Sequence, residues 1–129
     1  MKRMIWLAPL ALALLLLGCD GFGLFGKVTD EQLYGDLLTA KLTISDKGPE
    51  NDAKFIMYEV FNLAQKWPEA ERITLQITII SKSKEELDFG RHSWSDISEI
   101  RGYENKLEFI DKEKNLLLRI RRKLRKFLK

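Results

Sequence analysis

The stretch RITLQITIIS, residues 72–81, alternates between two kinds of side chain. One set of positions is aliphatic and holds Ile73, Leu75, Ile77 and Ile79, whereas the other is mostly polar and holds Thr74, Gln76, Thr78 and Ile80. Because successive side chains of a strand point to opposite faces of a sheet, this period of two predicts a half-buried β-strand over 72–81. The aliphatic face of that strand needs a second layer to cover it.

The residues before this strand have helical spacing. Apolar side chains recur three or four positions apart at Ala53, Ile56, Met57, Val60, Phe61, Ala64 and Trp67. Glu50 and Asp52 place negative charge at the positive end of the helix dipole, and Pro68 ends the pattern. We therefore predict a helix over 50–67 that is buried along one side. Its aromatic and methionine stripe is more typical of a core face than of a ligand pocket.

An earlier helix is predicted over 29–42. Thr29 and Gln32 have the spacing of a capping box, and Val28 and Leu33 have that of a hydrophobic staple. Apolar residues at Leu33, Leu37 and Ala40 then share one helical face, although Gly35 weakens the pattern. A turn is expected at 45–49, where Asp46, Gly48 and Pro49 all favour turns.

Further short strands are predicted at 86–92 and at 106–110, where Leu107 and Phe109 alternate with charged residues. Residues 95–101 fit either a helical turn or another strand. Residues 28–129 are enough for one small domain and too few for two. The predicted fold class is α+β, a small single domain with helices packed on one face of a mostly antiparallel sheet.

Charge is segregated at the carboxyl end of the chain. From Arg119 onward there are seven bases and no acid. If Asp111 caps a helix, its apolar side carries Leu117, Ile120, Leu124, Phe127 and Leu128. Bases occupy the other sides, at Arg119, Arg121, Arg122, Lys123, Arg125, Lys126 and Lys129. The segment is therefore predicted to be a basic amphipathic helix, with a hairpin turning at 112–115 as the alternative.

Three roles fit such a helix. We slightly favour a terminal helix whose leucines complete the core while its bases stay in solvent. Contact with anionic lipid head groups comes next, because juxtamembrane bases are attracted to them, and docking to another protein follows. Nucleic acid is not an expected partner, since the amino end of the chain indicates export.

That amino end has the three parts of a secretory signal. Lys2 and Arg3 are positive, and thirteen uncharged residues follow from Ile5 to Leu17. A membrane-spanning helix needs about twenty apolar residues, so this run suits a removable signal better than a permanent anchor. The run ends in Leu16, Leu17, Gly18 and Cys19, and Cys19 is the one cysteine of the chain.

This four-residue sequence resembles the lipobox of bacterial lipoproteins. The resemblance implies that the Cys19 thiol receives a diacylglyceryl group and that cleavage occurs between Gly18 and Cys19. Residues 1–18 would then be the signal peptide and 19–27 a lipidated glycine-rich tether. Asp20 resembles a signal for retention in the inner membrane, so the periplasmic face of that membrane is favoured over the outer membrane. The resemblance covers about twenty residues and identifies no family for the domain after them.

No catalytic set is recognised. His92, Trp94 and Asp96 alternate, which on a strand would place them on one side, but no nucleophile motif accompanies them. Acids at Glu85, Glu86 and Asp88 are ordinary for a solvated surface. One histidine excludes a histidine-rich zinc site, and neither a calcium loop nor a phosphate-binding glycine loop is present. No metal and no cofactor are expected.

We interpret the protein as a membrane-anchored envelope lipoprotein and not an enzyme. Its domain would act by non-covalent contact with another envelope component, a protein partner that no residue of the sequence identifies. Aromatic side chains supply contact area, so His92, Trp94 and Tyr103 are the predicted binding patch. The alternatives are a periplasmic domain that binds a small ligand or glycan and, behind it, a hydrolase of unrecognised type.

Overall fold

The computed structural model of the chain describes residues 26–128. The predicted leader, the lipobox, most of the tether and Lys129 lie outside these residues. In chain order the elements are β1 (Gly26–Tyr34), β2 (Leu37–Ser45), α3 (Pro49–Lys66), β3 (Arg72–Ile80), β4 (Glu86–Trp94), α4 (Ile97–Arg101), α5 (Lys106–Lys112) and α6 (Lys114–Phe127).

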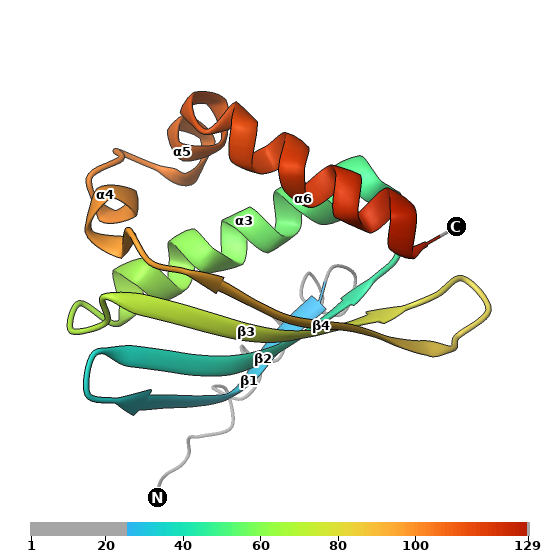
Figure 1. Cartoon of the computed structure of the whole chain (residues 1–129), viewed down its shortest axis with the longest axis horizontal. Coiled ribbons are helices and arrows are strands. Elements are labelled where there is room, and N and C mark those ends of the chain that lie inside the picture. Colours follow the sequence, from blue (N-terminus) through green and yellow to red (C-terminus); the bar gives the residue numbers. More distant parts are fainter. Residues whose placement is uncertain (1–25, 129) are drawn as a thin grey trace, which may run out of the picture.

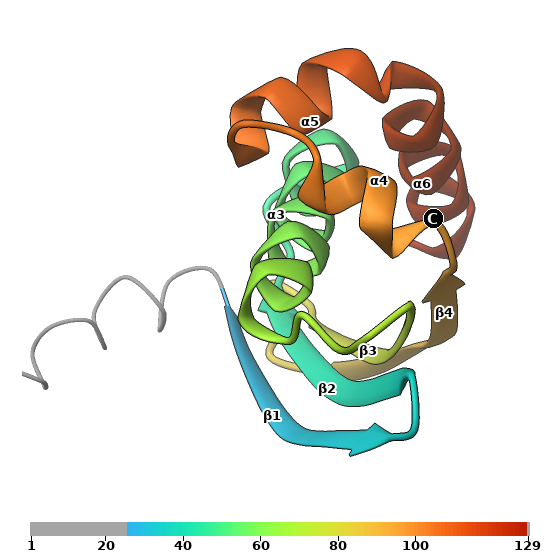
Figure 2. The same cartoon turned by 90° about the vertical axis from the view of Figure 1, so that its left-hand side faces the viewer.

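Within this part of the chain the four strands form one sheet in the order β1-β2-β3-β4. The outer pairs, β1 with β2 and β3 with β4, are antiparallel, and the central pair β2 with β3 is parallel. Helix α3 makes the crossover that a parallel pair requires. All the helices lie over one face of the sheet (Figures 1 and 2). The predicted α+β class is confirmed.

The core lies between the central strands and α3. β2 buries Leu38, Ala40, Leu42 and Ile44, and β3 buries Ile73, Leu75, Ile77 and Ile79. From α3 the side chains that close this layer are Ala53, Ile56, Met57, Val60, Phe61, Leu63 and Ala64. The strand predicted from 72–81 and the helix predicted from 50–67 are therefore confirmed, with the predicted aliphatic faces directed inward.

The helix predicted over 29–42 is wrong, because these residues form most of the β1–β2 hairpin. Its turn is at Gly35 and Asp36, and Gly35 has a φ of 65°, a conformation that glycine adopts without the strain of a Cβ atom. The apolar positions of β2 recur every second residue from Leu38 to Ile44. Pairing with β3 along the whole strand outweighs the capping signal at Thr29.

The first strand begins two residues earlier than the predicted domain boundary. Gly26 pairs with Ile44, so Gly26 and Lys27, which were assigned to the tether, belong to the sheet. A Cβ atom at Gly26 would lie 2.9 Å from Cγ2 of Ile44 and 3.0 Å from Cε2 of Phe55. Glycine therefore allows the chain to enter the sheet close against β2 and α3.

The segment after β4 is helical. The strand predicted at 86–92 is confirmed and extends to Trp94, whereas the strand predicted at 106–110 is wrong. The side chain of Asn105 caps α5 by accepting a hydrogen bond from the backbone N–H of Glu108 at 2.8 Å. Residues 97–101, for which helix and strand both stayed open, form the short helix α4.

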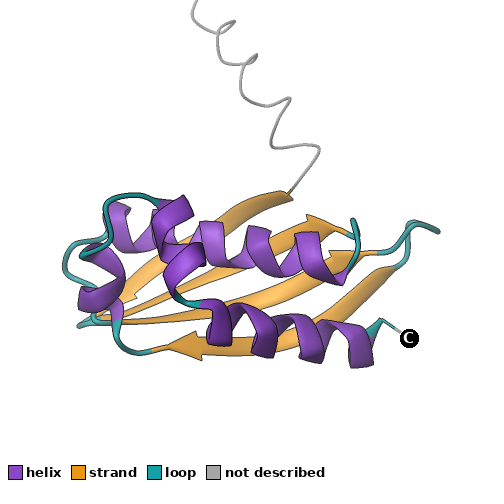
Figure 3. Cartoon of the chain, turned by 90° about the horizontal axis from the view of Figure 1, so that it is seen from above, coloured by secondary structure: helices purple, strands orange, loops and turns teal. Residues whose placement is uncertain are grey.

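The carboxyl-terminal segment is the predicted amphipathic helix, and the hairpin alternative is wrong. Asp111 does not cap it; Asp111 lies within α5 and pairs with Lys114 at 3.6 Å. Ile120 and Leu124 are buried, and Leu117, Phe127 and Leu128 are half-buried against the core. Seen from above the helices, α6 lies beside α3 (Figure 3).

We expect Leu124→Ala to lower the free energy of unfolding by about 3 kcal/mol, because it leaves a cavity where α6 meets the core. Leu124 has 0% of its surface exposed, whereas Leu118 on the same helix is 39% exposed. Leu118→Ala is the matched control and should change stability much less. Urea unfolding of both variants measures the difference, and equal losses would contradict the packing of α6.

Candidate functional site

Two residues of the predicted binding patch meet in a pocket beyond the end of β4. Trp94 and Tyr103 both line a cavity of about 250 Å³. α4 supplies Ile100, α5 supplies Phe109 and α6 supplies Leu116, and all three residues face the same cavity. The pocket therefore exists only where the strand and the three following helices come together.

Charged groups surround these aromatic rings. Asp96, Glu99, Glu113 and Arg119 also line the pocket, so carboxylates outnumber cations there. The hydroxyl of Tyr103 donates a hydrogen bond to Oε2 of Glu113 at 2.5 Å. This bond to a carboxylate raises the pKa of Tyr103 to about 12, because ionising the phenol would place two negative charges together. Tyr103 therefore acts as a neutral hydrogen-bond donor here.

His92, the third residue of the predicted patch, does not line this pocket. Its ring stacks on Phe89 with 4.4 Å between centroids, and Phe89 packs edge-on against Phe127 of α6 at 5.0 Å. Nε2 of His92 lies 3.1 Å from the backbone oxygen of Phe89. His92 thus helps to pack β4 against α6. Asp96, expected beside His92 and Trp94, follows the end of the strand at the start of α4.

Arg101 positions the helical wall of the pocket. Its guanidinium donates to the backbone oxygens of Ala64 at 2.9 Å and Trp67 at 3.1 Å, and also to that of Ala70. These carbonyls lie at and just beyond the end of α3, where helices leave acceptors without partners. One side chain thereby attaches α4 to the end of α3. Sequence reasoning missed Arg101, since nothing local in the sequence links residues 64–70 with 101.

The basic face of α6, defined as Arg119, Arg121, Arg122, Lys123, Arg125 and Lys126, is the second candidate surface. Because Ile120 and Leu124 are buried in the core, most of these basic side chains point into solvent. Within the described residues only Arg121 makes an ion pair, with Glu50 of α3 at 3.7 Å. The remaining charges of this face are available to an external anion.

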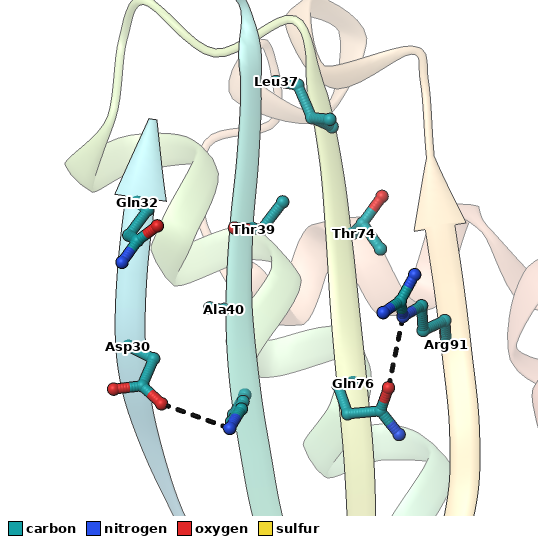
Figure 4. Close-up of a pocket in the computed structure, with 9 residues that line it drawn as sticks. Asp30, Gln32, Leu37, Thr39, Ala40, Thr74, Gln76 and Arg91 are labelled. Carbon is teal, nitrogen blue, oxygen red and sulfur yellow. Dashed lines mark hydrogen bonds and ion pairs between the residues drawn. The ribbon is translucent and has the colours of Figure 1, made fainter. Parts of the chain in front are cut away.

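A third concavity lies on the face of the sheet that none of the described helices covers (Figure 4). It encloses about 540 Å³ and was not predicted, because it depends on which strands are neighbours. Its polar side chains bind one another: Nε of Arg91 donates to Oε1 of Gln76 at 3.3 Å, and Nζ of Lys41 lies 3.4 Å from Oδ2 of Asp30. The strongest groups on this surface are thus already paired.

Among residues 26–128, no group of three or more histidine, cysteine or acidic side chains is arranged to hold a metal ion. None of the helices there has the length and hydropathy needed to cross a bilayer. Cys19, the predicted lipidation site, lies outside the range.

Comparison with protein-family models, with curated proteins and with solved structures finds no match. Three features of the chain bear on its function: the lipobox-like residues 16–19, the basic face of α6 and the Trp94–Tyr103 pocket.

Proposed function

We propose that this protein is a lipid-anchored component of the bacterial envelope, whose domain acts as a non-catalytic docking module. The observation that carries the proposal is the basic face of α6, which is directed outward by a buried apolar seam. Its proposed partner is an anionic surface of the envelope, either lipid head groups or an acidic protein. The periplasmic face of the inner membrane is the proposed location.

The anchor part of the proposal rests on the lipobox-like residues 16–19. One acyl chain binds a membrane reversibly, whereas two or more hold a protein there stably. Confinement to the bilayer raises the concentration of the domain near any partner in the same membrane. Weak contacts through the basic face would then be sufficient.

The docking part of the proposal rests on charge. Each base close to an anionic membrane contributes about 1 kcal/mol before screening by salt. Arg119, Arg122, Lys123, Arg125 and Lys126 form no ion pair with the other residues of 26–128, so they lose no partner there on binding. Nucleic acid also carries the negative charge that would attract these bases, but an exported protein would seldom encounter nucleic acid.

Cys19→Ser should abolish metabolic labelling with a fatty-acid analogue, because serine lacks the thiol that accepts the diacylglyceryl group. The measurement is labelling in the native host followed by mass spectrometry of the amino-terminal peptide. Persistent labelling of the Cys19→Ser variant would contradict the anchor.

The double variant Arg122→Gln/Lys126→Gln should bind anionic vesicles roughly 30-fold more weakly at low salt, since it removes two exposed bases. The experiment uses residues 19–129 carrying Cys19→Ser, so that no acyl chain contributes. Lys82→Gln/Lys112→Gln is the matched control, because it removes two exposed bases outside α6. Equal affinity of the two variants, or equal binding to neutral vesicles, would reject the docking role of α6.

The Trp94–Tyr103 pocket supports a second candidate function, the binding of a small ligand or glycan. Aromatic rings offer stacking surface and the surrounding carboxylates accept hydrogen bonds from hydroxyl groups. If this is correct, soluble saccharides should change the fluorescence of Trp94 in a saturable way in a Trp67→Phe background. Trp94→Phe should remove that response, and a panel of saccharides without any saturable response would exclude this candidate.

A further inference from the structure

Among the described residues, Asp52 is the one charged residue that is buried. It lies in the first turn of α3 and only 2% of its surface is exposed. Burial of an ionised carboxylate is costly unless hydrogen bonds or an opposite charge compensate it. The stability of a buried Asp52 carboxylate therefore depends on the hydrogen-bond donors near its two oxygens.

One of its two oxygens has an ordinary partner. Oδ1 of Asp52 accepts a hydrogen bond from the backbone N–H of Lys47 at 2.9 Å. Oδ2 is buried and meets no donor within the described residues. A buried oxygen atom without any hydrogen-bond donor is rare in folded proteins.

The neighbour of this carboxyl group is a second carboxyl group. Asp46 lies in the same turn between β2 and α3, where consecutive backbone N–H groups, those of Lys47 and Gly48, donate to Oδ1 of Asp52 and to Oδ1 of Asp46. The same turn holds Asp46 in place, because its Oδ1 accepts from the backbone N–H of Gly48 at 2.9 Å and its own N–H donates to the oxygen of Ile80 at 2.9 Å. Two ionised carboxylates in contact would repel each other and leave Oδ2 of Asp52 without a donor.

We propose that the β2–α3 turn is a proton-binding site, in which Asp46 and Asp52 share one proton taken from solvent. The protonated carboxyl donates an O–H···O hydrogen bond to the other, which supplies the missing partner. The pair then carries one negative charge instead of two. This inference does not depend on the proposed membrane anchor.

Other charged groups around the pair are consistent with a proton as the ligand. Lys47 is the cation that acts on Asp52, and Lys54 lines the same cavity of about 270 Å³ as Asp52 and Lys47. Glu50, in the same helical turn as Asp52, is directed to Arg121 of α6. A divalent metal would meet two lysines and the positive end of α3, and two carboxylates are few ligands for such an ion.

The site should make stability depend on pH in a defined direction. Burial, together with the carboxyl group of Asp46, raises the pKa of Asp52 to about 6. Since this value exceeds that of an unfolded aspartate, the folded chain binds more protons than the unfolded chain between about pH 4 and 6. The stabilising effect of the shared proton is complete below that window and is lost as the pH rises through about 6.

The test compares urea unfolding of the full chain, kept in a non-ionic detergent, at about pH 7 and about pH 4. In Asp52→Asn the amide N–H replaces the shared proton and donates to Asp46. Relative to wild type, we expect this variant to be more stable at the higher pH, by on the order of 100-fold in the unfolding equilibrium constant, and equal at the lower pH. Asp111→Asn, an exposed acid in α5, is the matched control and should keep the wild-type dependence on pH.

Carbon-13 NMR of the side-chain carboxyl groups of the wild-type chain provides a second measurement that needs no variant. Asp52 should titrate at about pH 6, and Asp46→Asn should move that titration to lower pH. An ordinary aspartate titration, or an unchanged pH dependence in a folded Asp52→Asn variant, would overturn the proposal. Stabilisation of the wild type by calcium or magnesium that Asp52→Asn abolishes would overturn it as well, because the site would then hold a metal.

Discussion

The parallel pairing of β2 with β3 is the constraint on which the rest of the fold depends. Its register runs without interruption from Leu37 opposite Arg72 to Ser45 opposite Ile80. Parallel neighbours cannot be joined by a tight turn, so the connection must cross over the sheet, and α3 is that connection. The two aliphatic rows are consequently buried beneath one helix, while β1 and β4 extend the sheet on either side as hairpin partners. None of the helices within residues 26–128 covers the opposite face of the sheet (Figures 1 and 2).

Polar groups in the interior are concentrated at the two ends of α3. At its carboxyl end Arg101 donates to backbone oxygens that the helix leaves without partners. At its amino end the carboxyl groups of Asp46 and Asp52 meet in the turn from β2. The Arg101 guanidinium supplies donors to these backbone oxygens, whereas Oδ2 of Asp52 has no donor among the described residues and would gain one only from the proposed shared proton.

The amino end of the described residues and helix α6 lie toward opposite edges of the sheet. Gly26 begins the edge strand β1, and α6 packs over the other edge strand through Phe127 and Phe89. The helical layer spans the distance between them (Figure 3). The Trp94–Tyr103 pocket opens at the end of the same layer.

Sequence by itself determined the elements whose pattern is long and regular. The strand from Arg72 and the helix ending near Trp67 were predicted because many residues repeat one period, and the basic amphipathic helix because charge and leucine alternate over more than two turns. Shorter stretches of sequence led to a wrong prediction. The spacing of Leu33, Leu37 and Ala40 fits a helix, although the buried residues of β2 have a period of two. The α+β class survived these errors because it depends on having one amphipathic sheet and helices to cover it. The lipobox-like sequence needs no fold to be recognised, and it stays a prediction.

Only the tertiary structure decided which distant residues meet. Trp94 and Tyr103 share a pocket because α4 carries the chain from the end of β4 to Tyr103, whereas His92 lies farther back on β4 and stacks on Phe89. Arg101 reaches the end of α3 through the path of the backbone in three dimensions. The physical reason is that periodicity indicates which side of one helix or strand is apolar. That property depends only on residues close together in the sequence. Contacts between polar groups depend instead on how whole elements are placed, which no local pattern encodes.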